Sequence, residues 1–178
     1  MIKRSSLVAS AYATVFLCLV VAGCSSSSTS GVDTTIVRGD NTAVWAGMYT
    51  GTLTLNSSVK VIGGETSEDT RTESVTVEVK SDGNVYLMLQ GTTMSGVMNN
   101  WGAWVVLASI NDLKSLLSEE NINRLDDAGC SLSKNLVKIE GSSTPPTISG
   151  VVSGQQKCRR FAVTIVKLTA TGTLSASL

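Results

Sequence analysis

The sequence predicts a mainly β protein: a small antiparallel up-and-down β-barrel with one helical insertion, or alternatively a β-sandwich. Three observations support this. Apolar and polar residues alternate with period two in several stretches, turn-forming residues separate those stretches, and only residues 111–128 have helical periodicity. Short strands linked by hairpins close into a barrel or stack as two sheets, because open strand edges promote aggregation.

The first expected strand begins at Trp45. Trp45, Tyr49 and Leu53 share one face, and threonines fill the other. Gly47 and Gly51 on the apolar face favour a strand that bends or lets another backbone approach. This Trp-x-Gly-x-Tyr-x-Gly start is similar in style to calycin-type barrels. The resemblance implies a barrel and assigns no residue a role.

A hairpin is expected next. Residues 63–72 are polar and are expected to separate the first strand from it. Residues 75–79 and 85–89 alternate as strands, and the Asp-Gly pair within residues 81–84 indicates the turn between them. A further short strand is expected over residues 93–98.

The segment from Trp101 to Leu107 is apolar on both faces near its end. We expect the helical segment 111–128 to cover its second face. In a regular strand Trp101 and Trp104 lie on opposite faces, so one belongs to the core. The other packs under the helix or belongs to an exposed recognition patch, and Trp104 is taken as the candidate binding residue.

The helical insertion contains residues that favour helix starts and helix ends. Ser118 before two glutamates predicts a break into two short helices, with Ser118 as the N-cap of the second. Gly129 fits a helix end.

Strand patterns resume after the insertion. They cover residues 136–140, 148–152 and 161–166, and residues 154–156 are expected to form a turn. Residues 171–174 repeat the Thr-Gly-Thr-Leu of residues 50–53, which we interpret as a shared strand pattern rather than an internal repeat.

The N-terminal region has the layout of an export signal. Basic residues precede an apolar run, which ends in Val21-Ala22-Gly23-Cys24. This tetrad resembles the lipobox of bacterial lipoproteins. The resemblance implies that residues 1–23 are a signal peptide and that the Cys24 thiol carries a diacylglyceryl group, with acyl chains such as palmitate holding the protein to a membrane. The alternative is an ordinary secretory signal that contains a cysteine.

The mature chain then divides into two parts. Residues 24–42 are rich in serine and threonine and are expected to be a flexible tether, and residues 43–178 are expected to form one domain. By the same resemblance, Ser25 favours the outer membrane, facing the periplasm.

Cys130 and Cys158 are the two cysteines left after the leader and the lipobox. In an oxidising compartment they are expected to form a disulfide. On the chain-entropy model, a disulfide that closes a loop of about 28 residues stabilises the fold by roughly 3–4 kcal/mol. The alternative is two unpaired buried thiols.

Composition restricts the chemistry. The chain has no histidine, so Ser-His-Asp and Cys-His catalysis are excluded. Charges balance at 14 basic and 14 acidic residues without a basic block, which argues against nucleic acid as partner. We expect no cofactor and no metal, because two cysteines do not complete a zinc site.

These observations favour a non-enzymatic, membrane-anchored envelope lipoprotein with a structural or protein-binding role. Its expected partners are the membrane, through Cys24, and another envelope protein. Arg159 and Arg160 are candidate contacts for an acidic partner, or else the solvated part of a strand. The alternative functions are a carrier of a small apolar ligand and a cell-wall hydrolase or its inhibitor.

Overall fold

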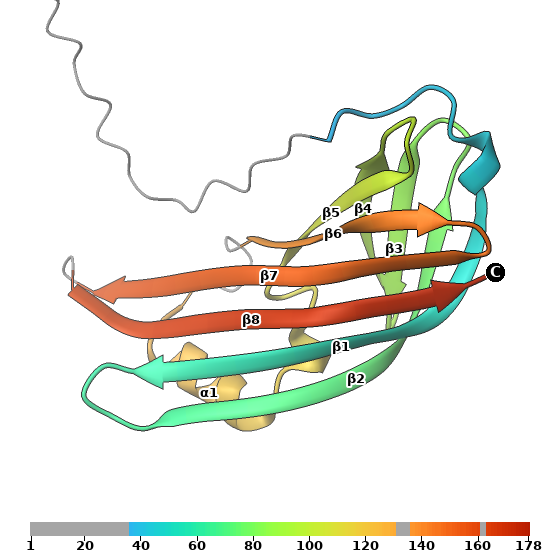
Figure 1. The fold of residues 1–178 in the computed structure, drawn as a ribbon. Helices are drawn as coiled ribbons and strands as arrows, with labels where there is room; N and C mark the ends of the chain where they lie inside the picture. The colour runs from blue at the N-terminus through green and yellow to red at the C-terminus, as the bar shows by residue number, and fades with distance from the viewer. Residues whose placement is uncertain (1–35, 131–135, 161–162) are drawn as a thin grey trace, which may run out of the picture. The chain divides into compact units, whose positions relative to one another are not determined.

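The chain forms a closed antiparallel barrel whose strands follow in sequence order, with β8 pairing back to β1 (Figure 1). This computed structural model describes residues 36–130, 136–160 and 163–178. The predicted up-and-down barrel with one helical insertion is confirmed, and the sandwich alternative is wrong. The strands are β1 (Gly47–Val61), β2 (Thr66–Val79), β3 (Asn84–Leu89), β4 (Thr92–Met98), β5 (Ala103–Ser109), β6 (Leu136–Thr144), β7 (Thr147–Arg160) and β8 (Val163–Ser177).

The strands differ in length. β1, β2, β7 and β8 have 14 or 15 residues, whereas β3, β4 and β5 have 6 or 7. At one end all strands meet, and we call this end the rim; it is formed by residues 36–46 and the turns at 80–83, 99–102 and 145–146. Toward the other end, the far end, the long strands continue alone.

Residue alternation sets the two faces of the barrel. Tyr49 and Leu53 of β1 point inward and are fully buried, while the threonines between them face outward. Leu53 lies opposite Leu174 of β8, so the two Thr-Gly-Thr-Leu segments lie on paired neighbouring strands.

Two strands extend further than the sequence predicted. Residues 66–72 belong to β2 rather than to a separating stretch, and residues 154–156 lie inside β7 rather than in a turn. Their backbones pair continuously with β1 and β8, as in Asn56 opposite Thr70 and Gln155 opposite Thr169. Backbone pairing sustains these stretches without apolar alternation, which is why the pattern missed them.

The insertion is broken as predicted. A 3-10 helix, η2 (Lys114–Leu116), precedes α1 (Glu119–Asp127), and the Ser118 side chain caps α1 by accepting the backbone N–H of Asn121 at 3.2 Å. Gly129 follows the helix end with a positive φ of 65°. Within the described residues, no helix has both the length and the apolar character needed to cross a bilayer.

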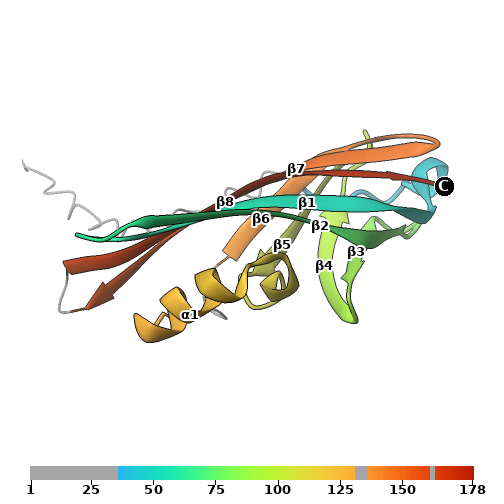
Figure 2. The same ribbon diagram turned by 90° about the horizontal axis from the view of Figure 1, so that it is seen from below.

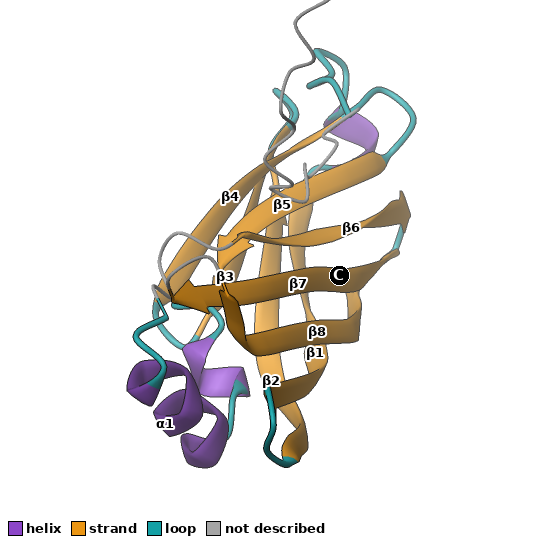
Figure 3. Cartoon of the chain, turned by 90° about the vertical axis from the view of Figure 1, so that its left-hand side faces the viewer, coloured by secondary structure: helices purple, strands orange, loops and turns teal. Residues whose placement is uncertain are grey.

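The insertion covers a different surface from the one expected. α1 packs mainly against β1 and β2 on the inner side of the long strands, and not over the outer face of residues 104–107 (Figures 2 and 3). Its Asn121 donates to Ser57 of β1 at 3.0 Å, and Leu125 is fully buried. The inner face requires this cover, because β3–β5 have ended there and no strand lies opposite.

Candidate functional site

The barrel interior is filled by the chain's own side chains. Trp104 and Tyr49 are both 0% exposed, and the Tyr49 hydroxyl donates to the Trp45 carbonyl at 2.8 Å. A Cβ placed on Gly150 would lie 2.7 Å from the Trp104 ring, so the indole fits only because position 150 is glycine. Other fully buried inward residues include Leu53, Val77, Leu87, Met98, Val106 and Ile139.

The choice of Trp104 as a binding residue is therefore wrong, because no part of its side chain reaches the surface. The exposed tryptophan is Trp101, at 83%. It lies in the β4–β5 turn, where its backbone N–H donates to Asn99 Oδ1 at 2.9 Å, and β5 begins only at Ala103. The Asn-Asn-Trp-Gly context was the available signal, since Asn and Gly favour a turn.

Exposed apolar side chains gather at the rim. Of the seven large apolar residues exposed in the described part of the chain, five lie on the rim segments or beside them: Val37, Val44, Met48, Trp101 and Leu178. Val37, Val44, Met48 and Trp101 are 78%, 69%, 59% and 83% exposed.

Within residues 36–46, hydrogen bonds fix Gly39 and Thr42 to the strand ends and turn at the rim. The N–H of Gly39 donates to the Met98 carbonyl at 2.7 Å, and the Thr42 hydroxyl donates to the Lys80 carbonyl at 2.7 Å. Thr42 is fully buried. The expectation that residues up to 42 belong to a flexible tether is therefore wrong for the described residues 39–42, because they are part of the fold.

Side-chain contacts fasten the same segment to the β4–β5 turn. Asn100 accepts the backbone N–H of Asn41 at 3.0 Å and donates to the Asp40 carboxylate at 3.1 Å. The Trp45 ring packs over Gly102, where a Cβ would lie 2.8 Å from it. These contacts hold the segments that carry the exposed apolar residues of the rim.

Charges at the rim are paired locally. Lys80 donates to Glu78, and this hydrogen bond and attraction raise the lysine pKa. Asp82 accepts the backbone N–H of Asn84 at 3.1 Å, which lowers the pKa of its carboxyl, and the Asn84 amide adds a second bond at 2.7 Å. Such pairs stabilise turns and resemble no acid–base couple.

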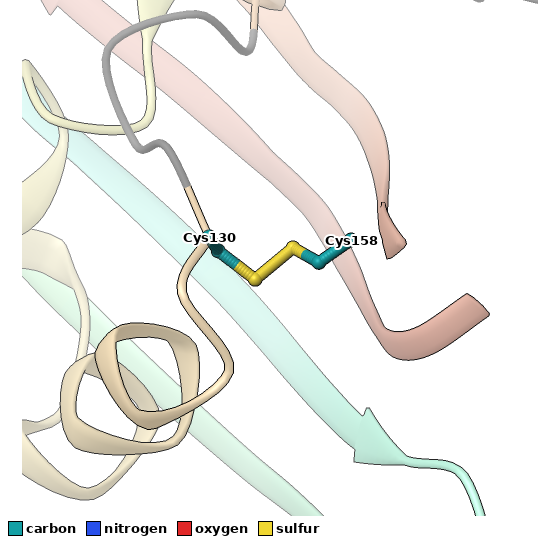
Figure 4. The surroundings of a disulfide bond; sticks show 2 residues. All are labelled: Cys130 and Cys158. Carbon is teal, nitrogen blue, oxygen red and sulfur yellow. A yellow bond between two sulfur atoms is a disulfide. The ribbon is translucent and has the colours of Figure 1, made fainter. Parts of the chain in front are cut away.

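The predicted disulfide is present. Cys130, just after α1, is bonded to Cys158 of β7, with their Cα atoms 5.5 Å apart (Figure 4). It joins the end of the insertion to a long strand. Arg159 beside it is exposed, whereas the Arg160 side chain and Cys24 lie outside the described part of the structure.

Two shallow hollows open on the outer surface of the barrel. One is largely apolar and includes Ile36, Gly141, Gly150 and Val151. The other is polar and includes Asn56, Glu68 and Thr70, and the Thr70 hydroxyl there donates to Asn56 at 2.8 Å. Across residues 36–130, 136–160 and 163–178, no group of three acidic, histidine or cysteine side chains is placed to hold a metal.

Comparison with known proteins adds no family. No protein-family model matches the chain, and a search of curated proteins found no significant match.

Proposed function

We propose that this chain is a lipid-anchored protein of the bacterial cell envelope whose barrel acts without catalysis, as a structural or protein-binding module. The anchor is Cys24, the final residue of the lipobox-like tetrad. The expected location is the outer membrane, with the barrel facing the periplasm.

The observation that carries the proposal is the filled barrel. Trp104 and Tyr49, together with the aliphatic residues of the inner face, occupy the space in which a carrier would hold its ligand. Contacts with other molecules therefore fall to the outer surface and the rim. The filled interior argues against the small-ligand carrier.

The disulfide supports an exported location. Cys130 and Cys158 are joined, and such bonds persist in oxidising compartments such as the periplasm. The charged side chains of the described part support a non-catalytic role. The paired carboxylates Glu119 and Glu120 are exposed on α1, and Glu120 binds Arg124 at 2.8 Å in an i,i+4 ion pair.

Mass spectrometry of the mature N-terminus, combined with cell fractionation, tests the anchor. Wild-type protein is expected to begin at a triacylated or diacylated Cys24 and to sediment with membranes. A Cys24→Ser variant is expected to leave the membrane fraction, because the acyl chains supply the attachment.

Two results would contradict the proposal. An unmodified Cys24 in wild-type protein removes the anchor, and hydrolysis of purified peptidoglycan by the barrel removes the non-enzymatic role. Cys18→Ser is the matched control, because it changes a cysteine of the leader outside the lipobox and should leave fractionation unchanged.

A further inference from the structure

Three lysines lie at neighbouring positions on the outer surface of the long strands, where β7, β8 and β1 run side by side (Figure 1). Lys60 of β1 is paired in register with Lys167 of β8, and Lys167 is paired with Lys157 of β7. They alternate with buried residues such as Val59 and Val166, so all three side chains point outward. Opposite residues on paired strands have Cβ atoms about 4.5–5.5 Å apart, so one ligand can contact all three. We call Lys60, Lys157 and Lys167 the lysine row.

The charges of the lysine row are not balanced by ion pairs. Among the residues that the structure describes, the basic side chains that form ion pairs are other ones: Arg71, Lys80, Arg124 and Lys138. The whole chain has equal numbers of basic and acidic residues, so the row does not follow from a basic composition. Like charges at opposite positions destabilise a sheet. An anionic ligand bound across the row would relieve this repulsion.

The surface beside the lysine row is uncharged and rich in hydroxyl groups. Every outward residue of β1 from Thr50 to Ser58, and of β8 from Thr169 to Ser177, is threonine, serine or asparagine. We call these two runs the hydroxyl face. They are paired in register, as in Thr54 opposite Thr173. Because these side chains both donate and accept hydrogen bonds, the face offers neutral polar partners along both strands.

The polar hollow on the outer surface lies between the hydroxyl face and the lysine row. Ser58 and Thr169, which are opposite each other, both line it, and the next outward residues along β1 and β8 belong to the lysine row. The carboxylates of Glu68 and Asp69 also line the hollow. Sugar hydroxyls can donate to these carboxylates and exchange hydrogen bonds with the serine and threonine. A phosphate or carboxylate on the same ligand can bind the lysines.

We infer that the lysine row and the hydroxyl face together bind an anionic polysaccharide, whose charged groups contact the lysines and whose hydroxyls contact the hydroxyl face. This inference goes beyond the proposed function and does not depend on the anchor at Cys24. An acidic protein fits this surface less well, because protein interfaces centre on aromatic and arginine side chains and the hydroxyl face has neither. An anionic bilayer would contact the lysine row and leave the hydroxyl face unused, since that face is neither apolar nor basic.

The test measures binding of the full chain, purified in an uncharged detergent, to polygalacturonate and to phosphorylated dextran, with unmodified dextran as the neutral control. Wild-type protein is expected to bind at least one charged polymer, and more weakly as salt rises, because salt screens exposed charges. Lys60→Gln/Lys167→Gln should bind about tenfold more weakly, because it removes two ion pairs with the polymer. Lys114→Gln/Lys138→Gln is the matched control, since it removes two positive charges from η2 and β6 and should bind as wild type does.

A second variant tests whether the ligand is a saccharide. Thr169→Val removes one hydroxyl from the hollow without changing the charge, so it should weaken binding about threefold and leave the salt dependence unchanged. Thr93→Val, which changes an exposed threonine of β4, should bind as wild type does. The thermal unfolding midpoint of each variant, measured without polymer, shows that a loss of binding is not a loss of fold.

Three results would overturn the inference. The first is that neither charged polymer binds, and the second is that the Lys60→Gln/Lys167→Gln variant binds as tightly as wild type. The third is that polyaspartate, or micelles containing phosphatidylglycerol, bind with the same dependence on the lysines while Thr169→Val changes nothing, which would assign the surface to an acidic peptide or to lipid. Because the state of Cys24 is read separately by mass spectrometry, none of these results bears on the proposed anchor.

Discussion

The two halves of this barrel cover their inner faces by different means. In the rim half, β1–β8 close a ring around Trp104, Tyr49 and Met98, so strands alone complete the core. In the far half, only long strands continue, and η2 and α1 cover them from the inside. The first half depends on ring closure and packing, and the second on an inserted segment tied by a disulfide.

The comparison shows what each half requires from the sequence. Large inward side chains fill the ring, and inward glycines such as Gly150 make room for them. The far half has no opposing strands, so its inner face would be open to water without the insertion. A helix of nine residues has little stability by itself. Its position therefore depends on packing against the long strands and on the disulfide to β7.

Removing the central side chain of the rim half is expected to have the largest effect. Trp104→Ala deletes a fully buried indole and should lower the free energy of unfolding by about 3–5 kcal/mol, measured by urea denaturation. Trp101→Ala is the control, because this residue is exposed, and we expect its effect to stay within about 0.5 kcal/mol. Equal losses in the two variants would show that Trp104 is not the centre of the ring core.

The disulfide tests the far half. Cys130→Ser/Cys158→Ser is expected to lower stability by about 3–4 kcal/mol, because the unfolded chain loses its cross-link. If the two halves are stabilised separately, hydrogen exchange should change more in the far half than in the rim half. Protection should fall in η2, α1 and the far ends of β1 and β2, while β3–β5 remain protected.

The same variant can contradict the division into halves. If β3–β5 lose protection as much as α1 does, the barrel is one cooperative unit and the disulfide stabilises it globally. The intact protein in reducing and non-reducing buffer gives a matched measurement without any substitution.

Much of the rim half could be predicted from the sequence. Period-two alternation identified the inward face of β1 and the β2–β3 hairpin with its Asp-Gly turn, because a half-buried strand needs that pattern. The pairing of Cys130 with Cys158 was predicted from the count of cysteines left over, on the expectation of an oxidising compartment, and the disulfide is present. The N-cap at Ser118 followed from local chemistry.

The rest depends on contacts between distant segments. Residues 39–42 were assigned to a polar linker from their composition, but the bonds of Gly39 to Met98 and of Thr42 to Lys80 make them part of the fold. The position of α1 depends on where β3–β5 end, which alternation does not report. Trp101 and Trp104 were exchanged because the β4–β5 turn extends two residues beyond Asn99-Asn100.

The smallest expected effect concerns the polar contact beneath α1. Asn121 Nδ2 donates to Ser57 Oγ at 3.0 Å, and both residues are buried. Asn121→Ala and Ser57→Ala should each lower the free energy of unfolding by about 1–3 kcal/mol, because each substitution removes one buried partner and leaves the other without this hydrogen bond. Since the two share one bond, the double variant should cost less than the sum of the single ones, by about 1 kcal/mol, in a thermodynamic cycle. Additive losses would mean that α1 is held by Leu125 and the disulfide alone, and that the polar pair contributes nothing to its position.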